Sequence, residues 1–170
     1  MTDRERAVAE LHRLIDGIPV AMVTTIAADE MLRARPMLLE CLEPDGTLVF
    51  LTHLSSQKTA EVRRNSRVNV AFQSDKGTAY VSVSGTATVA HDVERMRTLW
   101  NPTYRAWFPG GADDPDGAIF TVHIDRVEYW DVPSSRLMRL WGVAKALATG
   151  EVAESGDYNR IEFGDATSAD

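Results

Sequence analysis

The sequence FLTHLSSQKTAEVRRN, residues 50–65, joins a short apolar strand to a helix. The hydroxyl residues Thr52, Ser55 and Ser56 follow the strand, and Lys58 stands where the helix begins. Hydroxyls, free backbone N–H groups and an ammonium group at a helix N-terminus form a natural phosphate site. Taken alone, the same pattern more often indicates a plain helix cap.

The composition is that of a soluble protein with one sizeable core. The chain has 170 residues, of which 44% are hydrophobic and 25% charged. No apolar run approaches the roughly 20 residues of a membrane span, and the charged N-terminal stretch does not fit a signal peptide. The single cysteine, Cys41, excludes an internal disulfide and fits a reducing compartment. We therefore expect a cytoplasmic protein that does not bind a membrane.

The net charge of −7 is unevenly distributed. Six acids and one base lie in residues 151–170, so this segment carries −5 of the total. We expect residues 1–150 to form a single domain and residues 151–170 to form an acidic, mobile tail. The nearly neutral body lacks the basic face of a nucleic-acid-binding protein.

Hydrophobic periodicity predicts a mainly β fold with peripheral helices. Helices are expected over residues 4–16 and 57–65, from Asp92 to near Trp100, and from Ser134 or Ser135 to Gly150. The strands are mostly joined by short turns, which favours an antiparallel barrel or sandwich. The six expected strands are residues 20–26, 31–42, 47–52, 68–74, 78–90 and 118–130.

Arg35 is a candidate partner for the phosphate site. Pro36 follows it within a strand, which predicts a sheet edge or a bulge. If the first three strands form a meander, Arg35 lies near the end of strand 47–52 and close to Lys58. Two cations beside hydroxyl groups would bind a dianionic phosphate well. For Arg33, which lies on the same strand face, we favour a surface salt bridge.

No catalytic or metal-binding constellation is evident. The four histidines lack metal-ligand spacing, and only His53 adjoins the expected phosphate site. Hydrolase, P-loop and dinucleotide-binding motifs are missing from the sequence. The long loop 101–117 carries an aromatic cluster, and loops of this kind are usually functional or clamp a partner.

The chain resembles the flavin-binding split barrels related to pyridoxamine 5′-phosphate oxidase, and especially their bacterial general stress protein branch. The matching stretches run in the family's order and cover most of residues 8–149. They are ARPM (34–37), FLTHLSSQKTAEVRRNSRVNVAF (50–72), YVSVSGTATV (80–89), WFPGGADDPD (107–116) and VEYWD (127–131).

The resemblance implies a six-stranded antiparallel split β-barrel that forms a homodimer and binds FMN at the subunit interface. Ser56 and Lys58 would hold the phosphate, Trp130 would reach the flavin from the partner subunit, and Trp107 would cover the cleft. The positions that the resemblance assigns to the cofactor are Arg35, Pro36, Met37, Leu51, Thr52, Ser56, Gln57, Lys58, Tyr80, Trp107 and Trp130.

Three departures from the oxidase pattern bear on function. Gln57 stands where the oxidase has an arginine, so Arg35 or Arg33 is expected to supply the missing phosphate charge. Tyr80 stands where the oxidase has a flavin-contacting glutamine. The oxidase's substrate-binding arginine and histidine are replaced by DVPSSRLMRLWG (131–142), so vitamin B6 oxidation is not expected.

The first functional hypothesis is an FMN-dependent oxidoreductase of unknown substrate, with NAD(P)H or another small molecule as electron donor. No catalytic residue is assigned. The alternative is a non-catalytic FMN-binding protein with a role in stress response, flavin sensing or storage. A third hypothesis is a related planar ligand, either a deazaflavin or haem.

Overall fold

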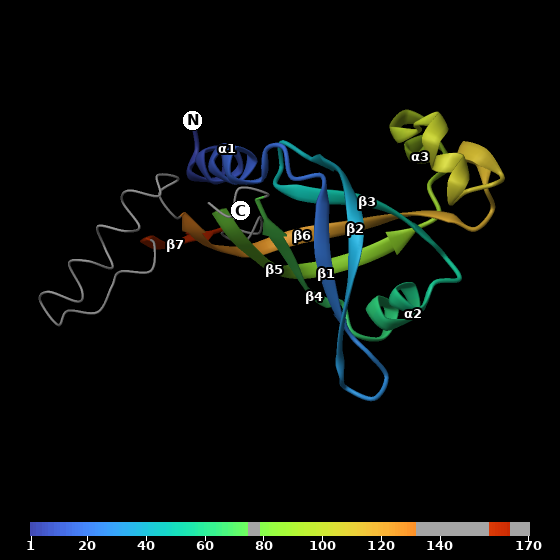
Figure 1. The fold of residues 1–170 in the computed structure, drawn as a ribbon, viewed down its shortest axis with the longest axis horizontal. Helices are drawn as coiled ribbons and strands as arrows, with labels where there is room; N and C mark the ends of the chain where they lie inside the picture. The colour runs from blue at the N-terminus through green and yellow to red at the C-terminus, as the bar shows by residue number, and fades with distance from the viewer. Residues whose placement is uncertain (75–78, 132–156, 164–170) are drawn as a thin grey trace, which may run out of the picture.

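The computed structural model describes residues 1–74, 79–131 and 157–163. Six of its strands close into an antiparallel barrel, because the sheet order β3-β2-β1-β4-β5-β6-β7 is completed by pairing of β3 with β6 (Figure 1). The expected mainly β fold and six-stranded barrel are therefore confirmed. The strands are β1 (Val20–Ile26), β2 (Leu32–Leu42), β3 (Thr47–His53), β4 (Arg67–Gln73), β5 (Ala79–Ala90), β6 (Gly117–Asp131) and β7 (Asp157–Glu162).

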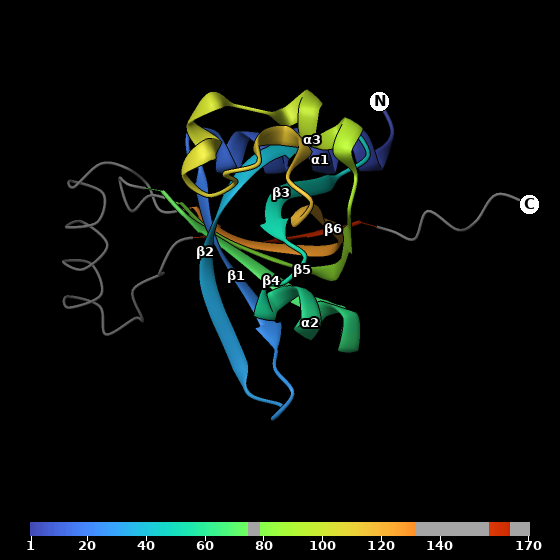
Figure 2. The same cartoon turned by 90° about the vertical axis from the view of Figure 1, so that its right-hand side faces the viewer.

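The helices lie around this barrel. In both views, α1 lies at one end and α2 at the other, while α3 stands with the short helices η1 and η2 beside β3 and β6 (Figures 1 and 2). The helix expected between Ser134 and Gly150 falls outside the described residues. The described helices are α1 (Asp3–Ile15), α2 (Gln57–Arg64), α3 (Val93–Leu99), η1 (Pro102–Ala106) and η2 (Gly111–Asp113).

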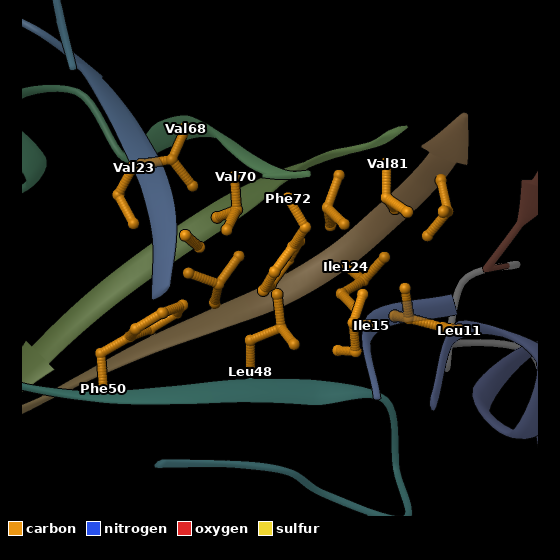
Figure 3. Close-up of a cluster of buried hydrophobic side chains, with 14 of the residues drawn as sticks. Leu11, Ile15, Val23, Leu48, Phe50, Val68, Val70, Phe72, Val81 and Ile124 are labelled. Atoms are coloured by element: carbon orange, nitrogen blue, oxygen red, sulfur yellow. The ribbon is translucent and has the colours of Figure 1, made fainter. Parts of the chain in front are cut away.

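Alternating strand residues fill the barrel interior. Phe50 and Phe120 are fully buried there and meet edge to face, with ring centroids 6.2 Å apart. Leu11 and Ile15 of α1 belong to the same apolar cluster, which Figure 3 shows between the strands. The amphipathic helix α1 therefore closes one end of the barrel with its apolar face.

The barrel is split between β2 and β3. These strands pair only from Leu39 to Leu42, opposite Phe50 to Leu48, with a bulge between Leu39 and Cys41. Pro36 lies in the part of β2 that pairs with β1 alone. Since proline has no N–H to donate, it suits a strand segment with one unpaired edge. The expected edge is therefore found at Pro36, and the bulge lies further along the strand.

The segment 91–116 leaves the barrel between β5 and β6. Its α3, η1 and η2 pack on the outer face of β3 and β6 through a second apolar cluster, which includes Val49, Met96, Phe108 and Ile119. Apolar groups thus cover both faces of β3. This explains why residues 47–50 are buried in succession instead of alternating with exposed ones.

Part of the expected acidic tail is a strand. Residues 157–162 form β7, which pairs with β6, and the next residue, Phe163, is only 5% exposed within the main core. Arg126 and Glu162 also form an ion pair across the two strands. The expectation of a mobile tail therefore does not hold for residues 157–163. The segment is acidic overall, but Ile161 and Phe163 are apolar and pack against the barrel core. Their burial favours docking of this segment on the barrel.

Asp116 fastens the segment 91–116 to the loop between β3 and α2. Its carboxylate accepts hydrogen bonds from the Ser55 backbone N–H at 2.8 Å and from the Ser55 hydroxyl at 2.6 Å. Its backbone carbonyl accepts a bond from the Leu54 N–H at 2.7 Å. The hydrogen bonds from Ser55 hold the pKa of Asp116 below its ordinary value, with a smaller contribution from His53.

We expect Asp116→Asn to lower the melting temperature at neutral pH, since the amide cannot replace a carboxylate that accepts both Ser55 bonds. The folded-state pKa is depressed, so the stabilisation is fully present above the unfolded value of about 3.9 and is lost as pH falls through the folded value. The difference in melting temperature between wild type and variant should therefore shrink in acid, as measured by calorimetry from pH 3 to pH 8. Asp113→Asn, which breaks an exposed pair with Arg97, is the matched control and should have little effect. A pH-independent difference for Asp116→Asn would contradict the assignment.

Candidate functional site

A cavity of about 290 Å³ lies where β2 and β3 separate. One wall comes from β1 and β2, a second from the end of β3 and the start of α2, and a third from aromatic residues of the segment 91–116. The lining residues are Val20, Pro36, Met37, Leu38, Glu40, Leu51, Thr52, His53, Lys58, Tyr104, Trp107 and Phe108. Most of these side chains are apolar. The polar ones are Thr52 and Lys58 near the start of α2, the pair Glu40 and Tyr104, and His53.

One polar group is a cluster of hydroxyls at the start of α2. The Thr52 hydroxyl, in a side chain only 2% exposed, lies 3.3 Å from that of Ser56, which lies 3.0 Å from that of Thr59. Ser56 is the N-cap of α2 and accepts a bond from the Thr59 N–H at 3.4 Å. Ser56 therefore does cap the helix, as the simpler interpretation of the sequence predicted. The cap is nevertheless joined to the cavity, because Thr52 lines it.

Lys58 brings a positive charge to the same end of the cavity. Its half-buried side chain lines the cavity from the first turn of α2. Burial lowers the pKa of Lys58, and the nearby charge of Arg35 lowers it further, while Glu61 acts in the opposite direction. Within the described residues its ammonium makes no hydrogen bond or ion pair. We call Thr52, Ser56 and Lys58 the anion cradle.

Arg35 lies near the anion cradle but does not line the cavity. Its guanidinium donates from Nη1 to Thr25 Oγ1 at 2.6 Å and from Nη2 to Glu61 Oε2 at 3.0 Å. Its charge still acts on Lys58, so the expected proximity of the two cations agrees with the structure. Sequence reasoning did not foresee that a buried carboxylate would engage the arginine.

Gln57 stands where a second phosphate-binding cation was expected, and neither Arg33 nor Arg35 supplies that charge as a free side chain. Gln57 is exposed and does not line the cavity. Arg33 forms a bidentate pair with Asp29 at 2.8 and 2.9 Å, which is the surface salt bridge that the sequence favoured. Lys58 therefore supplies the positive charge at the cavity wall.

Eight of the eleven predicted cofactor residues line one of two cavities. Pro36, Met37, Leu51, Thr52, Lys58 and Trp107 line the cavity described above. Tyr80 and Trp130, which are paired across β5 and β6, line a second cavity of about 320 Å³. Val20 lines both cavities, so the two adjoin at this residue. A single chain thus does not bring Tyr80 and Trp130 to the anion cradle.

Glu40 and Tyr104 line the cavity without having been predicted. Tyr104 Oη donates to Glu40 Oε2 at 2.7 Å. Burial raises the pKa of Glu40, although the Tyr104 bond opposes this, and burial together with Glu40 raises the pKa of Tyr104 to about 12. No local motif marks this pair, because 64 residues separate the partners.

His53 also lines the cavity, as its neighbourhood to the hydroxyl residues suggested. Its ring stacks on Phe108 with centroids 4.4 Å apart, and its Nδ1 lies 3.3 Å from Asp116 Oδ2. The aromatic cluster of the long loop was the signal that located Phe108 and Trp107. The loop indeed forms a cavity wall.

The chemistry of the donors fits a flat ligand with an anionic end. Aromatic and aliphatic walls can take an apolar ring, whereas hydroxyls, an ammonium group and a helix N-terminus can take a phosphate. FMN has both parts. In the portion of the chain that the structure describes, no three potential metal ligands gather. Nor does any described helix have the length and apolar character to cross a membrane.

Several known proteins are similar to this chain in sequence or in fold. Protein bli-3 of Neurospora crassa is 28% identical over 149 residues, which cover 82% of this chain and 71% of that protein. The crystal structure of a general stress FMN/FAD binding protein from Xanthomonas citri is 26% identical with a TM-score of 0.66, covering 76% of this chain and 92% of that one. General stress protein 26 from Bacillus anthracis, at 20% identity, has a similar fold with a TM-score of 0.63 over 72% of this chain and 92% of its own.

The family model described as pyridoxamine 5′-phosphate oxidase like matches residues 6–154. This range includes all strands of the closed barrel, the anion cradle and both cavities. The chain therefore belongs to the pyridoxamine 5′-phosphate oxidase-like family, with general stress proteins among its relatives.

Proposed function

We propose that this protein binds FMN in the cavity at the split of the barrel and acts as a flavin-dependent oxidoreductase. The observation that carries the proposal is the joining of an apolar, aromatic-walled cavity to the anion cradle. The similarity to an FMN/FAD binding protein from Xanthomonas citri supports a flavin. FMN suits the cradle because it ends in a phosphate monoester, which one ammonium and a helix N-terminus can hold.

The cavity residues would share the work of binding. Ser56 and Lys58 hold the phosphate beside Thr52, with the charge of Arg35 behind them. Pro36, Met37 and Leu51 lie against the ring, and Trp107 restricts access of water. When bound, FMN supplies the electron-transfer chemistry, with NAD(P)H or another small molecule as donor. Vitamin B6 is not the proposed substrate, because the oxidase motif that recognises it is replaced in this chain.

A non-catalytic role in flavin sensing, storage or stress response is the second candidate. Two observations favour it. Glu40 and His53 at the cavity wall are both engaged with protein partners, Glu40 with Tyr104 and His53 with Asp116. General stress proteins also occur among the relatives.

We further propose that a second copy of this chain covers the cavities. Val20, Met22, Leu38 and Tyr80 are each 40–48% exposed on the outer face of the sheet. Val20 lies directly opposite Leu38 in the register of β1 and β2, between the two cavities. Such exposed apolar surface marks an interaction site. A homodimer would bury it and allow the partner subunit to contribute Trp130 to the flavin.

FMN binding tests the anion cradle. We expect Lys58→Ala to weaken FMN affinity at least tenfold, because a charge-assisted phosphate contact is worth about 1.5–3 kcal/mol. Riboflavin, which lacks the phosphate, should bind wild type and variant equally. Flavin fluorescence titration measures both affinities. Gln57→Ala, at the exposed neighbouring position, is the control. A wild-type protein that binds no FMN would refute the proposed function, and an unaltered affinity in Lys58→Ala would refute the cradle.

Anaerobic reduction separates the two candidate functions. We expect NADH or NADPH to bleach the visible absorption of the FMN-bound protein rapidly, since an oxidoreductase must accept electrons from a donor that reaches the flavin. Dithionite provides the control that the bound flavin can be reduced. Bleaching by dithionite but by neither nucleotide would favour the non-catalytic alternative.

The oligomeric state tests the apolar face. We expect wild type to sediment as a dimer at micromolar concentration and Met22→Glu to sediment as a monomer, because the substitution places a charge in the interface. The same variant should bind FMN more weakly, since the cover that the partner subunit gives to the cavity is lost. Ala9→Glu, on the exposed side of α1, serves as the charge-matched control. A monomeric wild type would disprove the proposed interface.

A further inference from the structure

Glu61 is a buried carboxylate directly behind the anion cradle. Its side chain, on α2, is 4% exposed. Its Oε2 accepts a bond from the Thr25 hydroxyl at 2.5 Å and a bond from Arg35 Nη2 at 3.0 Å. Arg35 Nη1 also donates to Thr25 Oγ1 at 2.6 Å, so the three side chains form a closed triangle.

The second oxygen of this carboxylate is not satisfied. Oε1 is buried and has no hydrogen-bond partner among the described residues. A buried charge of this kind is unfavourable unless another charge compensates it. Burial alone would raise the pKa of Glu61, yet the Thr25 hydroxyl and Arg35 hold it below its ordinary value. Glu61 is therefore ionised at neutral pH.

The compensating charges belong to the phosphate site. Glu61 follows Lys58 by three residues on α2, which places both on one side of the helix. The charge of Arg35 lowers the pKa of Lys58, and Glu61 opposes that effect. Without a bound anion, the carboxylate thus offsets one of two neighbouring positive charges. The Glu61 carboxylate thus supplies the negative charge that a ligand phosphate would otherwise bring.

We infer that Glu61 is a built-in counter-anion, which neutralises Arg35 in the free protein and competes with a bound phosphomonoester for that arginine's charge. The inference deepens the proposed function and rests on the anion cradle being the phosphate site. Glu61 then sets the affinity of the site. The carboxylate stabilises the free protein and weakens binding of the anion.

The test is Glu61→Gln, which removes the charge and keeps the shape. Binding of inorganic phosphate is measured by calorimetry, and binding of FMN and riboflavin by fluorescence. We expect phosphate and FMN to bind about tenfold more tightly, because a carboxylate that repels the bound anion is removed, and riboflavin to bind as before. The free variant should melt at a lower temperature than wild type, because Arg35 and Lys58 then repel each other without compensation.

Asp29→Asn is the matched control, since it removes a carboxylate from the neighbouring Arg33 in an exposed pair. It should leave all three affinities unchanged. If folded Glu61→Gln binds phosphate as wild type does, or more weakly, Glu61 only positions Arg35 and the inference is overturned. Absence of phosphate binding by wild type overturns it as well.

The double variant Arg35→Met/Glu61→Met covers the case in which Glu61→Gln does not fold, because apolar residues commonly replace a buried ion pair without loss of stability. If the two charges offset each other, phosphate affinity should stay within about threefold of wild type. A loss beyond about tenfold would show that Arg35 binds phosphate unopposed.

Phosphate results as expected without FMN binding would refute the flavin function alone. FMN binding by wild type without tighter binding by Glu61→Gln would refute the counter-anion alone.

Discussion

The end of pairing between β2 and β3 is the constraint on which the site depends. The ladder stops at Leu39 opposite Phe50, and Pro36 lies just beyond, without an N–H to continue it. A fully paired barrel would press the side chains of the two strands together at this point. Because the strands separate, Pro36 and Leu51 instead face a cavity, and the chain after β3 is free to enter α2 beside it. The same separation places a helix N-terminus at the cavity wall.

The segment 91–116 turns this separation into an enclosed site. It covers the outer face of β3 with a second apolar cluster and presents Phe108 and Trp107 to the cavity. Asp116 ties the segment to Ser55, next to the N-cap of α2. The wall and the anion cradle are therefore fixed to each other by hydrogen bonds. This arrangement keeps the aromatic groups and the anion cradle at a constant spacing, which the proposed flavin ligand would require.

Much of the barrel could be predicted from the sequence, since its signals are local. Alternation of apolar residues, turn residues and helix caps placed the six barrel strands and α1 to α3 within a residue or two of their observed bounds. The site was less predictable where it depends on distant pairs. The bonds from Arg35 to Glu61 and from Tyr104 to Glu40 join residues 26 and 64 positions apart. Composition was also misleading for β7, where two apolar residues outweigh the surrounding acids.

The charges at the cradle bear on how the proposed site, with few cations, would hold a phosphate. Gln57 leaves one position neutral, and Glu61 offsets Arg35, so the one net positive charge of this group is that of Lys58 at the cavity wall. A strongly cationic pocket would be costly to fold without a ligand, because like charges half-removed from water repel strongly. Here the fixed dipoles of the α2 N-terminus and the hydroxyls of Thr52 and Ser56 carry part of the task without adding charge. In the proposed site, selectivity for a phosphate would come from the geometry of the donors and not from a large positive potential.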